Sequence, residues 1–259
     1  MKQTVDDIKQ RLKQADAKEF EVLSRTLADD PRKGVQAALR QAQERLRAQA
    51  DEEQRIAALY QYESDLASGG VIVGLDEVGR GPLAGPLTIG AVVLPRSPQI
   101  QGLNDSKKLT PATRSELAPL IKETALAYAI VHIPPADIDE LGMSKCLRLA
   151  FSRAVAQIEA QGVKPDVVLL DGNPLHFDER EVNVVKGDSK CASISAASII
   201  AKVERDSLMD DYALEYPGYG FESSKGYGSA AHIAAIKEKG LTPIHRVSFC
   251  GNFLQESLF

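Results

Sequence analysis

The stretch VIVGLDEVGRGPLAGPLTIGAVVL, residues 71–94, decides the fold. Its two ends are apolar runs rich in Val, Ile and Leu, which favour β-strands. Residues 79–86, between the runs, are rich in Gly and Pro, which are typical of a tight connection. Two short strands joined in this way predict a β-hairpin. Asp76 and Glu77 interrupt the first run, so two acidic side chains are expected in an otherwise apolar strand.

Strand-like and helix-like segments mix after the hairpin. A helix is expected over residues 110–125, where Thr110 can cap the first turn and Pro111 suits the first helical position. Further helices are expected over residues 137–161, 193–217 and 229–240, the last helix, and strands over residues 126–133, 166–172 and 181–188, with a Gly- and Tyr-rich loop at 218–229. This order predicts an α/β fold, a mixed sheet flanked by helices.

Residues 1–68 differ in amino-acid composition from the rest of the chain. They are rich in Gln, Ala and charged residues, and their apolar residues recur at helical spacing. We expect a small helical N-terminal extension of two to four helices, followed by a main domain over 69–250 and a C-terminal tail over 251–259. The extension has two interpretations. It is a packing arm, or it grips a substrate backbone through Arg40, Arg45 and Arg47.

The composition is that of a soluble globular protein. The chain has 259 residues, of which 44% are hydrophobic and 26% charged, and its 31 basic and 36 acidic residues give a net charge of −5. Collagen-like, disordered and membrane classes are therefore excluded for the chain as a whole. A nucleic-acid role would need a local basic face.

The cysteine pattern and the N-terminus bear on the compartment. Cys146, Cys191 and Cys250 are far apart and odd in number, which argues against a disulfide framework. The N-terminus has no apolar signal segment, and no stretch approaches the roughly 20 apolar residues that a membrane span needs. We expect a cytoplasmic protein.

Acidic residues stand at the ends of several expected strands. Asp171 ends the run VVLL, and Asp188 follows another β-like run, in addition to Asp76 and Glu77. A carboxylate in an apolar strand is costly unless it is paired or binds a cation. Carboxylates without Cys or His ligands favour hard ions such as Mg²⁺ or Mn²⁺. Two such ions about 4 Å apart would suit phosphodiester hydrolysis. Taken alone, Asp76 or Asp171 could be a strand-end or turn residue, and Asp188 could cap the following helix.

Seven motifs follow one another in the second part of the chain. They are GLDEVGRGPLAGP (74–86), NDSKKL (104–109), LLDGN (169–173), VKGDSK (185–190), SAASIIAKVERD (195–206), YGFESSKGYGS (219–229) and HRVSF (245–249). In these motifs the chain resembles ribonuclease HII, the type 2 ribonuclease H family, which cleaves RNA within RNA/DNA hybrids. The resemblance covers roughly residues 70–250, and the helical extension resembles that of a subgroup of bacterial members.

The resemblance implies a ribonuclease H-like fold and catalysis by two metal ions, Mg²⁺ or Mn²⁺. The family's four acids match Asp76, Glu77, Asp171 and Asp188. It further implies a monomeric endonuclease that cuts 5′ to a ribonucleotide, leaves 5′-phosphate and 3′-hydroxyl ends, and removes ribonucleotides misincorporated into DNA. The substrate-binding residues that it implies are Gly79, Arg80, Gly81 and Tyr227, with phosphate contacts from Lys107, Lys108, Lys186, Lys190 and Lys225.

Neighbouring residues of the same motifs allow more than one role. Lys202 and His232 are further candidates for phosphate contacts, whereas Glu204 and Asp206 are expected to be solvated or ion-paired. His245 and Arg246 could be structural or could face phosphate.

The chain ends in QESLF, in which Gln255, Leu258 and Phe259 resemble the short peptide that docks into the bacterial DNA sliding clamp. Two apolar anchors and one hydrogen-bonding side chain are enough to fill a hydrophobic pocket. An accidental apolar terminus is the other interpretation.

Two rival functions remain at this point. The sister enzyme ribonuclease HIII shares the acid core, but its members carry a sheet-containing N-terminal domain, whereas residues 1–68 are expected to be helical. A non-catalytic hybrid-binding protein with a decayed site is the other rival, and the presence of all four acids argues against it.

Overall fold

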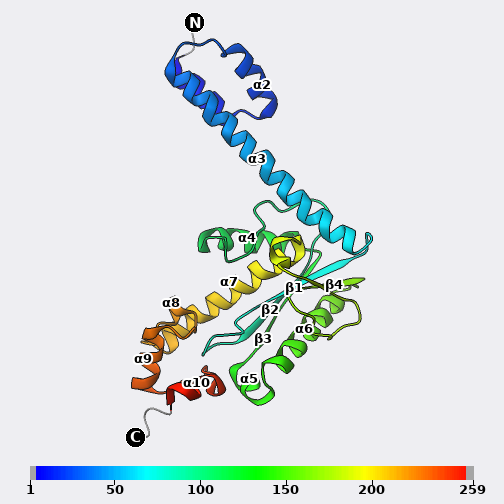
Figure 1. Cartoon of the computed structure of the whole chain (residues 1–259), viewed down its shortest axis with the longest axis vertical. Coiled ribbons are helices and arrows are strands. Elements are labelled where there is room, and N and C mark those ends of the chain that lie inside the picture. Colours follow the sequence, from blue (N-terminus) through cyan, green and yellow to red (C-terminus); the bar gives the residue numbers. More distant parts are fainter. Residues whose placement is uncertain (1–3, 255–259) are drawn as a thin grey trace. The chain divides into compact units, whose positions relative to one another are not determined.

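The computed structural model describes residues 4–254 (Figure 1). The chain divides into two compact units, Met1–Ala57 and Ala58–Phe259. One long helix, α3 (Lys33–Leu66), contains the point of division and ends within the second unit.

Among the described residues of the first unit, every regular element is a helix. The unit contains α1 (Val5–Gln14), α2 (Ala17–Thr26) and most of α3. Thr4 and Asp7 form the reciprocal capping box that starts α1. Arg45 donates to the carbonyl oxygens of Leu12 and Ala15, at 3.3 and 2.5 Å, and so closes the C-terminal end of α1. This side chain therefore has a structural role within the unit.

The second unit is built on a five-stranded mixed sheet in the order β3-β2-β1-β4-β5. The predicted hairpin is confirmed, because β1 pairs antiparallel with β2, while β4 lies parallel to β1 on its other side. The strands are β1 (Ile72–Val78), β2 (Leu87–Val93), β3 (Ala127–Ile133), β4 (Val167–Asp171) and β5 (Glu181–Val184).

One face of the sheet forms the main hydrophobic core with α6 (Met143–Ala160). Alternate strand residues such as Leu75 and Ile89 point to this side and pack with Phe151 and Ile158. The helix α4 (Pro111–Thr124) begins as predicted, with the Thr110 side chain accepting from the N–H of Thr113.

The opposite face of the sheet carries α7 (Ala192–Glu215), which crosses β1 and β2 closely (Figure 1). Two strand glycines leave the space for it. A Cβ atom at Gly74 would lie less than 3.0 Å from the backbone of Ser193 and Ile194, and one at Gly90 less than 3.0 Å from the carbonyl oxygen of Ala197. Small residues on both partners thus allow helix and sheet backbones to approach.

The N-terminus of α7 is capped by a residue of another helix. Cys191 occupies the N-cap position and gives no side-chain hydrogen bond. Glu63, in the last turns of α3, instead accepts from the N–H and the hydroxyl of Ser193, at 2.9 and 2.8 Å. Burial raises the pKa of Glu63 to about 6, although these hydrogen bonds oppose the shift. Such a contact is a helix cap supplied from 130 residues away in the chain.

Three helical predictions need correction. The helix expected over 137–161 is two helices, α5 (Pro135–Leu141) and α6, because Gly142 adopts φ 76° between them. The loop expected at 218–229 contains the short α8 (Phe221–Ser224). The helix α9 (Ala230–Lys239) is not the last, because α10 (Val247–Leu254) follows it.

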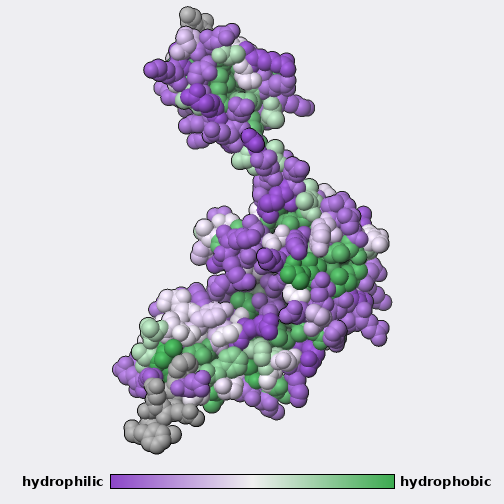
Figure 2. Space-filling model, in the orientation of Figure 1, coloured by the Kyte–Doolittle hydropathy of each residue, from purple (hydrophilic) through white to green (hydrophobic). Residues whose placement is uncertain are grey.

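The surface of the first unit is mainly hydrophilic on the face shown in Figure 2, and apolar residues are scattered over the second unit. Within residues 4–254, no helix has both the length and the apolar character that crossing a bilayer requires.

Candidate active site

Two of the four candidate acids lie side by side near the end of β1 and point to opposite faces of the sheet. Asp76 is buried on the side of α7, where the Ser198 side chain hydrogen-bonds to it. Glu77 lies on the side of α6, lines a cavity with Leu147 of that helix, and pairs with Arg80 at 3.2 Å. The alternation of side chains along a strand explains the split.

Asp171 lies next to both Asp76 and Glu77. β1 and β4 pair as far as Leu75 and Leu170, so Asp76 and Asp171 are the next residues along adjacent parallel strands. Asp171 also lines the cavity that contains Glu77. Its Oδ1 atom accepts the N–H of Gly187, at 2.7 Å, and this bond fixes the turn that carries Asp188. The four acids therefore share one neighbourhood, centred on Asp171.

The pKa values of Asp76, Glu77 and Asp188 are all raised. The pKa of Asp76 rises to about 8, first because the group is buried and then because Glu77 and Asp171 carry like charges nearby. Burial also raises the pKa of Glu77, with a contribution from Asp171. The pKa of Asp188 rises to about 6 by burial and by the charge of Asp171. A cluster of this kind gains stability from a positive partner.

The donor set fits a hard divalent cation. Its members are carboxylates in a half-buried, mutually repelling group, which suits Mg²⁺ or Mn²⁺. Within residues 4–254, no three acidic, histidine or cysteine side chains are already arranged so that together they could hold a metal ion. Mg²⁺ does not need such a cage, because it is commonly held by one or two carboxylates with water and substrate phosphate.

Lys107 is a second cation beside this cluster, in addition to Arg80. Burial lowers its pKa, but the charges of Asp76, Asp105, Asp188 and Asp171 outweigh that effect and the net shift is upward. The lysine therefore stays protonated beside the acids, where it offsets part of their charge and can meet a phosphate.

The segment between β1 and β2 places two candidate substrate residues together. A Cβ atom at Gly81 would lie 3.9 Å from Cε1 of Tyr227, so the tyrosine ring borders that glycine. Tyr227 is 48% exposed, unusually open for a large aromatic residue. An exposed ring beside a bare backbone offers a flat apolar surface next to polar groups.

The other candidate lysines differ in their surroundings. Lys108, Lys186 and Lys190 are exposed, as phosphate contacts require. Lys225 is half-buried, pairs with Asp210 and donates to the Asp206 carbonyl oxygen. Its ammonium group is thus already engaged.

The two acids of α7 that were expected to be solvated or ion-paired form ion pairs. Asp206 pairs with Lys202 at 2.6 Å, which occupies that lysine as well. Glu204 lies 3.4 Å from Lys122.

His232 and His245 form a buried pair and do not face a ligand. Their Nε2 atoms are 3.0 Å apart, and His232 Nδ1 hydrogen-bonds to the carbonyl oxygen of Tyr227 at 2.8 Å. The backbone N–H of Thr242 donates to His245 Nδ1 at 2.9 Å. Burial, followed by the neighbouring imidazole, lowers the pKa of His245 to about 4. Arg246 is fully buried as well, so both residues of the HR pair are structural.

Sequence reasoning missed three polar residues at the site. Ser198 hydrogen-bonds Asp76 and lies 2.9 Å from the hydroxyl of Ser106, which is also buried. Asp105 interacts with Asp188. Asp105 and Ser106 lie in the motif NDSKKL, so their position beside Lys107 was the available signal. Ser198 lies in the motif SAASIIAKVERD, and this membership was its available signal.

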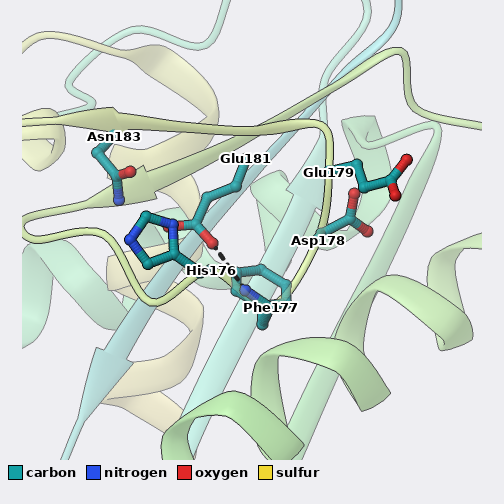
Figure 3. A pocket seen from close by; sticks show the side chains of 6 residues that line it. All are labelled: His176, Phe177, Asp178, Glu179, Glu181 and Asn183. Atoms are coloured by element: carbon teal, nitrogen blue, oxygen red, sulfur yellow. Dashed lines mark hydrogen bonds between the residues drawn. The ribbon is translucent and has the colours of Figure 1, made fainter.

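A second cavity lies in the loop between β4 and β5 and is separate from these acids (Figure 3). His176, Asp178, Glu179 and Asn183 line it with Glu181, whose carboxylate accepts the N–H groups of Leu175 and Phe177. Glu181 thus serves to fold its own loop.

Comparisons with known proteins identify the family. The model of the family described as "Ribonuclease HII" matches residues 73–252, and the model described as "Ribonuclease HII N-terminal domain" matches residues 4–67. A ribonuclease HII of Lactobacillus delbrueckii subsp. bulgaricus is 43% identical over 246 residues, which are 95% of this chain and 94% of the relative.

Solved structures share the fold of the second unit. The ribonuclease H2 from Pyrococcus horikoshii OT3 has 27% identity and a TM-score of 0.60, and the match covers 72% of this chain and 98% of that one. Bst-RNase HIII in complex with Mn²⁺ has a TM-score of 0.61 at 21% identity, with 75% of this chain and 74% of that one covered, a likeness of fold alone.

The matches decide which of the two sister families, ribonuclease HII or ribonuclease HIII, includes this chain. The described residues of the extension are helical, and they match the N-terminal domain model of ribonuclease HII. The strand-end acids, the hairpin connection and both family matches agree, and the chain belongs to the ribonuclease HII family, metal-dependent endoribonucleases that act on RNA/DNA hybrids.

Proposed function

We propose that this chain acts as a monomer and hydrolyses the phosphodiester bond on the 5′ side of a ribonucleotide. Its substrates would be RNA/DNA hybrids and DNA duplexes that carry embedded ribonucleotides, and its products 5′-phosphate and 3′-hydroxyl ends. The observation that carries this proposal is the gathering of four carboxyl groups around Asp171, next to the segment that contains Gly81 and Tyr227. The cellular role would be the removal of ribonucleotides from DNA.

The four acids, Asp76, Glu77, Asp171 and Asp188, would hold two divalent ions, Mg²⁺ or Mn²⁺. Bound ions would lower the pKa of the attacking water and stabilise the charge on the leaving oxygen. The chain's own part is to keep carboxylates from β1, β4 and the turn after β5 at one place. Ser198, through its hydrogen bond to Asp76, and Gly187, through its N–H to Asp171, support that arrangement.

Recognition of the ribonucleotide would come from the hairpin connection and the neighbouring tyrosine. The 2′-hydroxyl group distinguishes RNA from DNA, and backbone groups at Gly79, Arg80 and Gly81 can approach a sugar closely. The exposed ring of Tyr227 would pack against the adjacent sugar. Phosphate contacts would come from Lys107, Lys108, Lys186 and Lys190, with Lys225 contributing only if it leaves Asp210.

An end-labelled DNA duplex with one ribonucleotide tests the proposal directly. With Mg²⁺ or Mn²⁺ we expect a single cut on the 5′ side of that ribonucleotide and no cut in the matched all-DNA duplex. EDTA should abolish the cut. Cleavage of long hybrids without any cut at the single ribonucleotide would favour the activity of the sister enzyme, and binding without cutting of either would favour a non-catalytic role.

We also propose that the tail binds the DNA sliding clamp through Gln255, Leu258 and Phe259, which lie outside the described residues. An RNase HII from Archaeoglobus fulgidus has been solved as a complex with PCNA. Deletion of residues 255–259 should abolish binding to the clamp in a pull-down and leave cleavage of the short duplex unchanged. Unchanged clamp binding would contradict the proposal.

A further inference from the structure

Arg205 of α7 and Arg246, just before α10, are both fully buried. A buried guanidinium group is costly unless its donors are satisfied. Burial lowers the pKa of both side chains, and that of Arg246, lowered further by the charge of Arg205, falls to about 10. Both groups therefore remain charged at neutral pH, so the fold must compensate for them.

The compensation comes from backbone carbonyl oxygens. Arg246 donates from Nη2 to Gly79 at 2.6 Å and from Nη1 to Arg80 at 3.0 Å. It also makes two bonds to Gly85, at 2.8 and 3.0 Å. All three acceptors belong to the connection between β1 and β2, residues 79–86. One planar side chain therefore holds both ends of that connection.

Arg205 connects the same segment to a second one. It donates to the carbonyl oxygens of Pro86 at 2.9 Å and Ala84 at 3.1 Å, and its remaining nitrogen donates to that of Lys225 at 2.9 Å. Lys225 precedes Tyr227 by two residues. The Arg205 side chain is therefore a brace between the hairpin connection and the segment that carries the tyrosine.

The glycines of the connection make room for this brace. A Cβ atom at Gly79 would lie less than 3.0 Å from Nε of Arg205, and Gly79 and Gly85 have φ values of 90° and 87°. These conformations turn the carbonyl groups inward and suit glycine. Gly81 differs, because its only close neighbour there would be Tyr227, so it faces the open side.

The outward side of the connection keeps free donors. Over the described part of the chain, the amide N–H groups of Arg80 and Gly81 donate to no other group. The carbonyl oxygens of Gly79 and Arg80 are committed to Arg246, so the backbone cannot turn over without losing those bonds. The amide N–H groups of Arg80 and Gly81 are thus fixed in position beside the ring of Tyr227, where they can donate to a bound nucleotide.

We propose that Arg205 and Arg246 are positioning residues for ribonucleotide discrimination, because they hold the 79–86 connection and Tyr227 in the one arrangement that lets both meet the same nucleotide. This inference rests on the proposed function. It adds to it a pair of residues that touch no substrate and yet set the preference for ribose over deoxyribose.

Arginine-to-lysine substitutions test the brace. Lysine keeps the charge and most of the stem, but its three donors are on one nitrogen atom, so it cannot reach the separate carbonyl groups that Nε, Nη1 and Nη2 of an arginine reach. For Arg205→Lys and Arg246→Lys we expect kcat/KM on the single-ribonucleotide duplex to fall by about 10- to 100-fold. Arg180→Lys is the matched control, because Arg180 also donates to a carbonyl oxygen, that of Pro165, but lies in the β4–β5 loop.

The decisive readout is the ratio of two affinities. Anisotropy with EDTA present compares the single-ribonucleotide duplex with the same duplex in all-DNA form, uncut. The brace predicts that this ratio falls towards one in both variants and is unchanged in Arg180→Lys. An unchanged ratio, whether or not affinity and stability fall, would overturn the proposal and leave the arginines purely structural.

A second variant covers the case in which the lysine variants do not fold. Gly85→Ala keeps both arginines, but its Cβ atom would lie less than 3.0 Å from Sδ of Met209 and 3.1 Å from Nη2 of Arg205, at a φ of 87° that suits glycine, so it disturbs the same connection. It should lower the affinity ratio in the same direction, and an unchanged ratio would count against the brace. A wild-type ratio of one, by contrast, would refute the proposed function itself.

Discussion

Asp171→Asn should reduce cleavage of a ribonucleotide-containing duplex by at least about a thousandfold, equivalent to about 4 kcal/mol in the reaction barrier. Asparagine keeps the Oδ1 atom that accepts the N–H of Gly187, so the turn that carries Asp188 should stay in place. It removes the negative charge that Asp76 and Asp188 both face. Single-turnover rates with Mg²⁺ measure the effect.

The same substitution should leave the protein at least as stable as the wild type. Like charges around Asp171 repel one another in the absence of a cation, and the variant removes one of these charges. Thermal unfolding in EDTA should therefore show an equal or higher melting temperature, and affinity for the hybrid should persist. Lost activity together with gained stability is the pattern expected of a functional residue and not of a structural one.

Asp166→Asn is the control at the opposite end of the same strand. Asp166 immediately precedes β4, at the end of the strand opposite to Asp171, and its carboxylate accepts the N–H of Val71 at 2.8 Å. Its variant should cleave within about twofold of the wild-type rate, as expected for a change outside the site. An Asp171→Asn protein that kept more than a tenth of the activity would contradict the assignment of the acids.

Gly90→Ala should destabilise the second unit by about 3 kcal/mol, because a new methyl group would press on a backbone. The Cβ atom would lie less than 3.0 Å from the carbonyl oxygen of Ala197, which cannot move unless α7 moves. Gly90 is paired with Asp76 across β1 and β2, so the disturbance falls beside the site. Urea unfolding measures the loss of stability.

Activity should fall as well, because α7 carries Ser198 to Asp76 and Ser195 to the carbonyl oxygen of Asp188. Gly251→Ala is the matched control, since a Cβ atom there would meet nothing within 4 Å. That control should retain stability and rate. A Gly90→Ala protein as stable as the wild type would mean that the helix–sheet contact is looser than its geometry indicates.

The sequence predicted those parts of the fold that depend on interactions between residues near one another in the chain. The hairpin follows from two apolar runs around a Gly/Pro connection, and the start of α4 follows from Thr110 and Pro111. The opposite orientations of Asp76 and Glu77 follow from strand geometry. The break at Gly142 was missed because apolar spacing continues on both sides of it.

Contacts between distant segments could not be predicted in this way. Arg205 and Arg246 look like ordinary charged residues in the sequence, and their partners are backbone oxygens, which leave no trace in residue types. His232 and His245 are 13 residues apart, and each is a hydrogen-bond partner of the other in the interior, which the sequence does not show. The gathering of all four acids was expected from their strand ends, whereas Asp105 and Ser198 needed the folded chain.

The ending of α3 limits where the molecule can be divided or recombined. The hydroxyl of Tyr60 accepts the N–H of Ile100, and Glu63 caps α7, both inside the second unit. A fragment that started at residue 69 would retain every acid of the site. The N–H groups of Ser193 and Ile100 would, however, lose their acceptors, Glu63 and Tyr60. A chimera that exchanges the N-terminal helices must therefore keep the final two turns of α3 together with the nuclease unit. The boundary between the two exchangeable parts lies inside one continuous helix.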